Sequence, residues 1–294
     1  MKHILILGKS SYIGTSFAQY VREHRPEEFQ VKAVSLRDAH WREEDFSKYE
    51  AVFHVAGIAH ADVGQVTEEE KQEYYRVNRD LTLEAAKKAK ESGVGQFVYM
   101  SSMIVYGKTE HVTLDTIPKP ENFYGDSKWQ ADKGVRAMGD EKFRVAVLRA
   151  PMIYGKGSKG NYPVLVKMAR KLPLFPKVKN RRSMLYIENL CEFICHVIGE
   201  GREGVFFPQN EETVSTSRLV EEIAGVWGHR IWVTPLLAPV VSMGKHFPGK
   251  IGGLCRKAFG NSYYEPQMSR MGWNYCVADW KESVKRTEKG DFPS

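Results

Sequence analysis

The sequence contains no long hydrophobic run. Its first apolar stretch, Ile4–Leu7, is followed at once by a turn, so it is too short for the core of a secretory signal. The most apolar later stretch, about Pro235 to Gly244, contains two prolines and has about half the length that spans a bilayer. We therefore expect a cytoplasmic protein without membrane insertion.

Cysteine is also scarce. Cys191, Cys195, Cys255 and Cys276 form neither a disulfide framework nor the two close pairs of a zinc site, and this usage suggests a reducing compartment. Cys191 and Cys195 share one face of a predicted helix. Their apolar neighbours favour two thiols packed in the core over a pair of metal ligands, so we predict no metal site.

The composition is that of an ordinary folded protein. The chain has 294 residues, of which 42% are hydrophobic and 27% charged, which excludes a largely disordered chain. The net charge of +7 fits either nucleic acid or a nucleotide diphosphate as partner. The basic run Lys177–Arg182 contains no aromatic residue, and no nucleic-acid-binding module accompanies it. We therefore expect no nucleic-acid partner; the run is a diphosphate contact or a solvated loop.

The first half of the chain alternates short apolar runs with longer amphipathic stretches, which is typical of βαβ units in a parallel sheet. The predicted strands are Ile4–Leu7, Val31–Leu36, Ala51–Val55, Gln96–Met100 and Arg144–Leu148. The predicted helices are Ser11–Arg22, Glu68–Ser92 and Tyr124–Met138. This pattern predicts a doubly wound, Rossmann-type α/β domain over residues 1–155 that binds a dinucleotide.

Beyond Pro151 the pattern is less regular and contains more Gly and Pro loops. Further helices are expected near Tyr162–Lys171, Glu188–Ile198, Ser217–Trp227 and Asp279–Thr287, whereas Leu236–Gly260 has no clear assignment. We expect residues 156–294 to form a smaller C-terminal α/β lobe that binds substrate, with some segments returning to the first domain.

A turn bounded by Gly8 and Gly14 follows the first predicted strand. The first glycine permits a tight turn and the second permits close helix-to-strand packing, so that the amides at the start of the helix face a pyrophosphate. Ser11 stands where a middle glycine is common, and its hydroxyl is small enough to face a phosphate. The predicted dinucleotide contacts here are Gly8, Ser10, Ser11, Tyr12, Ile13 and Gly14.

The end of the second predicted strand bears on the choice between NAD and NADP. An acid at this point normally accepts a hydrogen bond from the 2′-hydroxyl of NAD. Ser35 aligns with that acid, and Arg37 follows with a guanidinium that pairs well with a 2′-phosphate. The pattern favours NADP, although the nearby carboxylate of Asp38 argues for NAD.

Tyr124 and Lys128 are four residues apart and so share one face of a predicted helix. A tyrosine with a pKa of about 10 catalyses proton transfer poorly at neutral pH unless positive charge, here from Lys128, favours the phenolate. The pair alone is also compatible with a solvent-facing helix. Upstream, however, a predicted strand ends in Ser101 and Ser102, at the edge where open α/β sheets bind ligands. We select Ser102 as the third member of the site.

Taken in order, these blocks resemble the extended short-chain dehydrogenase/reductase family, and within it the NAD(P)-dependent sugar-nucleotide epimerase, dehydratase and 4-ketoreductase group. The resemblance covers about residues 1–200. It rests on Gly8–Gly14, Val52–Gly57, Asn78, Ser101–Gly107, Tyr124–Lys128 and Leu148–Gly155.

The resemblance implies roles for individual residues. Tyr124 is the acid–base group, Lys128 holds the nicotinamide ribose and lowers the pKa of Tyr124, and Ser102 bonds the reacting hydroxyl or ketone. Further implied cofactor contacts are Val55, Ala56, Gly57, Asn78, Ala150, Pro151 and Ile153. Trp41 either helps to frame the adenine or is an ordinary packing residue. Asn161 and Arg182 match substrate diphosphate contacts, with Arg182 preferred over Arg181.

The expected reaction is oxidoreduction at C4 of a nucleotide-diphosphate sugar for surface polysaccharide or sugar-nucleotide biosynthesis, by a 4-epimerase or a 4-ketoreductase. A dehydratase is disfavoured because no Asp-Glu pair follows Ser102. One alternative is an NADPH-dependent ketoreductase acting on a non-nucleotide carbonyl compound. A different class is a dinucleotide-binding sensor without catalysis. The resemblance also implies a homodimer through the two long helices of the first domain.

Overall fold

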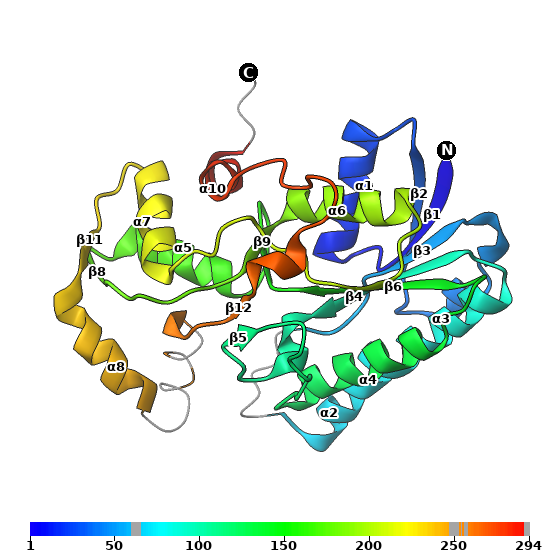
Figure 1. The fold of residues 1–294 in the computed structure, drawn as a ribbon, viewed down its shortest axis with the longest axis horizontal. Helices are drawn as coiled ribbons and strands as arrows, with labels where there is room; N and C mark the ends of the chain where they lie inside the picture. Colours follow the sequence, from blue (N-terminus) through cyan, green and yellow to red (C-terminus); the bar gives the residue numbers. More distant parts are fainter. Residues whose placement is uncertain (60–65, 247–252, 254, 256–257, 291–294) are drawn as a thin grey trace.

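The computed structural model describes residues 1–59, 66–246, 253, 255 and 258–290. These residues form a parallel sheet of six strands in the order β2-β1-β3-β4-β6-β10 (Figure 1). The strands are β1 (Lys2–Leu7), β2 (Phe29–Val34), β3 (Ala51–His54), β4 (Gln96–Ser102), β6 (Arg144–Ala150) and β10 (Gly204–Phe206). The direction of strand progression reverses between β1 and β3, which is where open α/β sheets bind ligands. The Rossmann-type prediction is confirmed.

Helices cover both faces of the sheet (Figure 1). On one face lie α1 (Tyr12–His24) and α6 (Ile187–Gly199), and on the other lie α3 (Leu81–Glu91) and α4 (Phe123–Ala137). Ile4 and Ile6 belong to the core under α1 and α6, whereas Leu5 and Leu7 belong to the core under α3. Because both faces are buried, β1 is apolar throughout its second half rather than alternating.

The predicted helix Glu68–Ser92 is interrupted in the structure. It consists of α2 (Glu68–Tyr75), a π-helical segment (Arg76–Asp80) and α3. A capping box between Thr67 and Glu70 starts it, and Gly93, with φ +78°, follows its end. The wider π turn contains Asn78, whose side chain is fully buried.

Several predicted strand boundaries differ from the observed ones by one or two residues. The second strand ends at Val34 rather than Leu36, because the Val34 carbonyl accepts hydrogen bonds from the amides of Gly8 and Lys9 instead of continuing a ladder. β4 and β6 each extend two residues beyond their predicted ends, because they pair with each other as far as Ser102 and Ala150.

The C-terminal lobe is built from short elements. Its strand pairs are β7 (Met152–Tyr154) with β9 (Met184–Tyr186), β8 (Leu174–Pro176) with β11 (Trp232–Thr234), and β12 (Tyr263–Tyr264) with β5 (His111–Val112). Its helices include α5 (Asn161–Lys171), α7 (Thr216–Val226), α8 (Ala238–His246) and α10 (Trp280–Lys289). Short 3₁₀ turns span Ala39–Arg42, Phe46–Lys48, Met103–Tyr106, Pro235–Leu237 and Pro266–Ser269. Although they lie beyond residue 155, α6 and β10 belong to the large sheet and its cover.

The structure shows where two of the cysteines and part of the stretch Leu236–Gly260 lie. Cys191 and Cys195 are both buried in the core on α6, and burial raises the pKa of each thiol. Of the stretch Leu236–Gly260, which had no assignment, α8 accounts for Ala238–His246, while residues 247–252, 254, 256 and 257 lie outside the described part. Among the described residues, no helix combines the length and apolar character that crossing a bilayer requires.

Candidate active site

The predicted cofactor and catalytic residues gather along the carboxyl edge of the large sheet. β1 ends at Leu7 and β3 at His54, and these two residues are paired. β4 and β6 continue past this row to Ser102 and Ala150. The helix α4, which carries Tyr124 and Lys128, packs beside β4 and β6. Segments far apart in the sequence therefore meet at one edge.

The turn after β1 has the geometry of a dinucleotide-binding turn. Gly8 has φ +135°, and a Cβ there would lie 2.9 Å from the amide nitrogen of Ala56. A Cβ on Gly14 would lie 2.8 Å from the Gly8 carbonyl oxygen. Both positions require glycine for the close approach of helix, turn and strand. The cradle therefore fits a dinucleotide pyrophosphate at the start of α1.

Ser11 has a more specific place than the sequence indicated. Its hydroxyl accepts a hydrogen bond of 2.9 Å from the Gly14 amide and so caps the N-terminus of α1. The next residue, Tyr12, has a buried hydroxyl without a hydrogen-bond partner among the described residues. That hydroxyl lies against Gly155, where an added Cβ would be 2.6 Å from it. The first turn of α1 is thus packed against the loop that opens the C-terminal lobe.

The residues predicted to contact the adenosine end of the cofactor differ in how exposed they are. The Ser35 hydroxyl accepts a hydrogen bond from the Arg37 amide, which closes a turn after β2. Arg37 is exposed, and its guanidinium makes no ion pair within the described part of the chain. Trp41 is only 2% exposed and packs with Phe46 in the core, which favours the packing alternative for this residue.

The loop after β3 is held by Asn78. The Asn78 side chain accepts a hydrogen bond of 2.8 Å from the Ile58 amide and donates one of 3.1 Å to the Ile58 carbonyl. A Cβ on Gly57 would lie 3.0 Å from the Asn78 amide oxygen and 3.7 Å from the Lys128 ammonium. Val55, Ala56 and Gly57 are therefore fixed between the Gly8 turn and Lys128.

Lys128 is buried and its ammonium is aimed at the end of β4. It donates a hydrogen bond of 2.7 Å to the Met100 carbonyl and lies 4.6 Å from the centre of the Tyr99 ring. Burial lowers the pKa of Lys128 to about 7, while the carboxylate of Asp132 opposes this shift. Lys128 is thus poised between its charged and neutral forms near neutral pH.

Tyr124 differs from the expectation that Lys128 lowers its pKa. Burial raises the pKa of Tyr124 to about 12, and the contact that opposes this shift is with the Ser102 hydroxyl. The reason is geometric, because the Lys128 ammonium is bonded to the Met100 carbonyl. The protein's own residues therefore hold Tyr124 as a neutral phenol at pH 7, ready to donate a proton.

Ser102 and its neighbour Ser101 have different surroundings in the structure. Ser101 is buried and donates a hydrogen bond of 3.1 Å to Asp132, so its hydroxyl is part of the interior. Ser102 is partly exposed and accepts a weak bond of 3.3 Å from the Ile104 amide. Ser102 has its hydroxyl near Tyr124, so it is the better placed of the two for the predicted role.

A buried ion pair under the site was not predicted from the sequence. Arg149 on β6 bonds both carboxylate oxygens of Asp132 on α4, each at 2.9 Å, and also donates to the Tyr106 hydroxyl at 2.7 Å. Tyr264 from the lobe donates a bond of 2.7 Å to the Arg149 carbonyl. The signal was an arginine inside an otherwise apolar strand, which demands a buried partner. The pair fixes α4 on the sheet.

His54, at the end of β3, is another buried polar residue without an assigned role. It is fully buried between Phe97 and Tyr99, and neither ring nitrogen has a hydrogen-bond partner among the described residues. Burial lowers its pKa to about 3, with a smaller contribution from Lys128. His54 therefore stays neutral and adds no charge beside Lys128.

Three predicted cofactor contacts and one predicted substrate contact lie at the end of β6 or beyond it. Ala150 and Pro151 are buried at the end of β6, and Ile153 follows them on β7, half-buried. Asn161 is exposed at the first turn of α5.

The two arginines of the basic run differ. The backbone of Arg182 forms bridges to Val214 and Ser262, and burial lowers the pKa of its guanidinium. Arg181 is exposed, and its guanidinium stacks 4.0 Å over the ring of Tyr263. Arg182 is therefore the more enclosed of the two cations, and its role as a substrate contact stays a prediction.

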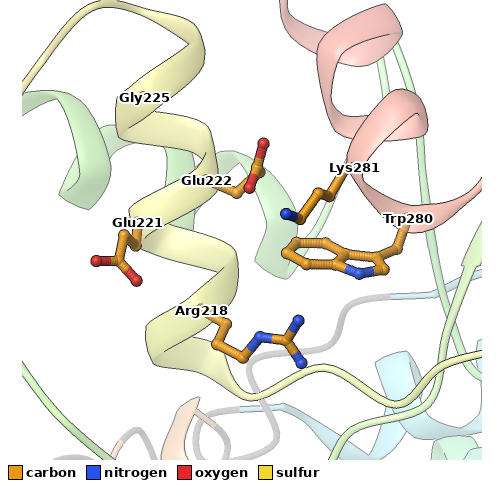
Figure 2. Close-up of a pocket in the computed structure, with 6 residues that line it drawn as sticks. All are labelled: Arg218, Glu221, Glu222, Gly225, Trp280 and Lys281. Atoms are coloured by element: carbon orange, nitrogen blue, oxygen red, sulfur yellow. The ribbon is translucent and has the colours of Figure 1, made fainter.

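A surface pocket lies elsewhere in the lobe, between α7 and α10 (Figure 2). Figure 2 shows Arg218 and Lys281 on opposite sides of the Trp280 ring, with Glu222 facing Lys281. The pocket is lined by Arg218, Glu221, Glu222, Gly225, Trp280 and Lys281. None of the predicted site residues lines this pocket. We therefore keep the carboxyl edge of the sheet, where those residues gather, as the candidate site.

The sheet order and the Gly8–Gly14 turn define a dinucleotide-binding fold of the Rossmann class. Residues 4–207 match a family model described as the NAD dependent epimerase/dehydratase family. The chain belongs to this family, which confirms the resemblance drawn from its motifs.

Two relatives illustrate the similarity. UDP-glucose 4-epimerase from Vibrio cholerae is 33% identical over 196 residues, which are 63% of this chain and 59% of that protein. N-acetyl-alpha-D-glucosaminyl-diphospho-ditrans,octacis-undecaprenol 4-epimerase from Escherichia coli O157:H7 is 25% identical over 276 residues, which are 86% of this chain and 78% of that protein. The match to the first relative thus spans less than two thirds of its length.

Solved structures share the fold over nearly the whole chain. UDP-glucuronic acid 4-epimerase from Bacillus cereus, solved with a fluorinated UDP-sugar and NAD, has a TM-score of 0.72 at 15% identity and 98% coverage of both chains. dTDP-4-dehydrorhamnose reductase from Bacillus anthracis, solved with NADP, has a TM-score of 0.67 at 18% identity and 98% coverage of both chains. Structures of this fold therefore bind either NAD or NADP.

Proposed function

We propose that the protein is an enzyme that carries out NAD(P)-dependent oxidoreduction at C4 of a nucleotide-diphosphate sugar, as a 4-epimerase or a 4-ketoreductase. The observation that carries the proposal is the meeting of Ser102, Tyr124 and Lys128 at the end of β4, next to the loop that Asn78 holds. A neutral phenol, a hydroxyl and a buried amine beside a dinucleotide turn are the groups that carbonyl–alcohol interconversion needs.

Each of these residues has a distinct task. A bound nicotinamide supplies or accepts the hydride. Ser102 donates a hydrogen bond to the reacting sugar oxygen and orients it toward Tyr124. Tyr124, held as a neutral phenol, donates its proton to that oxygen during reduction and takes it back during oxidation. Lys128 positions the cofactor ribose and supplies positive charge when it is protonated.

The substrate assignment rests on the lobe. Arg182 provides an enclosed guanidinium that can bond two diphosphate oxygens, and Asn161 provides an exposed amide at the entrance of α5. The names of both relatives describe 4-epimerases of diphosphate-linked sugars, which supports chemistry at C4. The exposed guanidinium of Arg37 favours NADP over NAD, and therefore the reductase form.

Two measurements test this proposal. Purified protein is denatured and the released dinucleotide is identified: tightly held NAD indicates an epimerase, and an empty site that prefers NADPH indicates a reductase. Thermal unfolding is then followed with UDP or UDP-sugars, which we expect to raise the midpoint because they bind only the folded state.

The arginine pair provides a matched control for the second measurement. Arg182→Ala should abolish the stabilisation by UDP, whereas Arg181→Ala, which removes an exposed cation one residue away, should retain it. If no UDP-sugar stabilises the wild type, the ketoreductase acting on a non-nucleotide carbonyl compound becomes the better assignment.

A further inference from the structure

One end of the C-terminal lobe exposes large apolar side chains. Leu172 and Leu174 are 38% and 42% exposed, Trp232 is 68%, Leu236 is 78% and Met243 is 64%. We call these five residues the apolar tip. They lie on or beside β8, β11 and α8, which Figure 1 shows together at the end of the molecule opposite β1 and β2.

The backbone holds most of the apolar tip in one place. β8 and β11 are paired so that Leu174 lies directly beside Trp232, and the exposed side of this two-stranded sheet carries both residues. The next strand pair, Phe175 and Val233, faces inward. The chain continues from the end of β11 into the turn Pro235–Leu237 and then into α8. Leu236 therefore lies just beyond the end of the strand that carries Trp232. Large exposed apolar side chains that gather at one end of a molecule in this way mark an interaction site.

The segments that carry the tip residues have charged side chains of a single sign. Asp and Glu make up 36 of the 294 residues, yet Lys142–Ile187 and Ile223–Tyr264, which contain all five tip residues, have none. Lys171, Lys177 and Arg230 lie within three residues of Leu174 or Trp232, and all three are exposed. None of these three cations makes an ion pair within the described part of the chain. The tip therefore offers apolar and positive groups together.

The combination of apolar and positive groups determines which kind of partner fits the apolar tip. A partner must bury apolar side chains and supply negative charge around them over a wide area. An anionic lipid surface does both, because apolar groups enter the acyl boundary while Lys and Arg stay among the headgroups. Trp232 has the amphipathic ring that is enriched at this boundary.

We propose that the apolar tip docks the protein on the surface of an anionic lipid bilayer. This docking is to the membrane surface, since no helix among the described residues can cross a bilayer. The docked segment is close in sequence to the proposed substrate contact Arg182, because the basic run Lys177–Arg182 follows β8 directly. Docking does not depend on the proposed reaction, and a Tyr124→Phe variant should bind vesicles as the wild type does.

Sedimentation with vesicles tests this proposal. The full chain is mixed with vesicles of phosphatidylcholine, with and without phosphatidylglycerol, at low and high salt. We expect binding to the anionic vesicles at low salt, weaker binding at high salt, and little binding to pure phosphatidylcholine. Leu236→Asp should weaken binding about tenfold or more, because it removes one inserted side chain and adds negative charge.

The chain offers matched controls. Ile117, at 82% exposed, is as accessible as Leu236 but lies far from the tip in sequence, so Ile117→Asp should bind vesicles as the wild type does. Lys171→Glu should weaken binding roughly fivefold or more, whereas Lys87→Glu on α3 should not.

Three results would overturn the proposal. The first is no binding to anionic vesicles at low salt. The second is equal loss of binding in Leu236→Asp and Ile117→Asp. The third is a dimer in sedimentation velocity that Leu236→Asp dissociates, since the occupant of the tip would then be a second copy of the chain. Circular dichroism and thermal unfolding of each variant establish that it is folded, so that lost binding reports on the tip.

Discussion

The carboxyl edge of the large sheet and the apolar tip use charge in opposite ways. At the edge, Lys128 and Asp132 are buried, and each has a specific partner within the protein. At the tip, Lys171, Lys177 and Arg230 are exposed and form no ion pair with any residue that the structure describes. Buried ionic groups fix geometry and shift pKa values, whereas exposed groups of one sign select a partner. This difference in charge fits the proposals made above, which assign the chemistry to the edge and the recognition of anionic partners to the lobe.

The largest expected effect comes from Tyr124→Phe at the edge. The variant keeps the aromatic ring but loses the phenolic hydroxyl that donates the proton. The rate of turnover should therefore fall by about 10²- to 10⁴-fold, while dinucleotide binding is unchanged. Steady-state kinetics and a dinucleotide titration measure the two quantities. Tyr263→Phe, in the lobe, is the control, because its hydroxyl has no hydrogen bond among the described residues. Unchanged turnover in Tyr124→Phe would favour the non-catalytic sensor.

Lys128 should make the stability of the dinucleotide-free protein depend on pH. Its pKa is about 7 in the fold and about 10.4 in an unfolded chain, so between these values only the unfolded chain binds the proton. The free energy of unfolding should therefore rise with pH in this window, by about 1.4 kcal/mol per pH unit. Urea unfolding at pH 7 and pH 9 measures the rise.

Two variants on the same helix isolate this contribution. Lys128→Met should remove the rise, whereas Lys133→Met, at an exposed position on α4, should retain it. An equal rise in Lys128→Met and in the wild type would mean that another group is responsible.

The smallest expected effect compares one substitution in the two regions. Gly14→Ala would place a Cβ 2.8 Å from the Gly8 carbonyl, so the turn must open, and dinucleotide affinity should fall roughly tenfold. Gly225→Ala on α7 meets no atom within 4 Å and should stabilise the protein by up to about 1 kcal/mol. Fluorescence titration and thermal unfolding distinguish the two. If Gly14→Ala bound the dinucleotide with wild-type affinity, the assignment of the Gly8–Gly14 turn to the cofactor site would be wrong.

Much of the first domain was predictable because its signals are local. The apolar runs of β1 and β3, the glycine turn and the spacing of Tyr124 and Lys128 are all read within a few residues. The choice of Ser102 over Ser101 rested on strand-end position, and the structure supplies the reason, since Ser101 is bonded to Asp132. The π turn at Asn78 was missed because a helix with one wider turn has nearly the same apolar spacing as a regular one.

The sequence by itself determined the family and the parallel α/β fold, because strand alternation, turn glycines and helix spacing are local properties of the chain. It also led to the proposal of Ser102, Tyr124 and Lys128 as the reacting groups. Only the tertiary structure decided that the Ser11 hydroxyl caps α1, that Lys128 bonds the Met100 carbonyl, and that Arg149 pairs with Asp132. It alone also placed Leu174 beside Trp232 at the apolar tip. These features depend on burial and on contacts between distant segments, which no local pattern encodes.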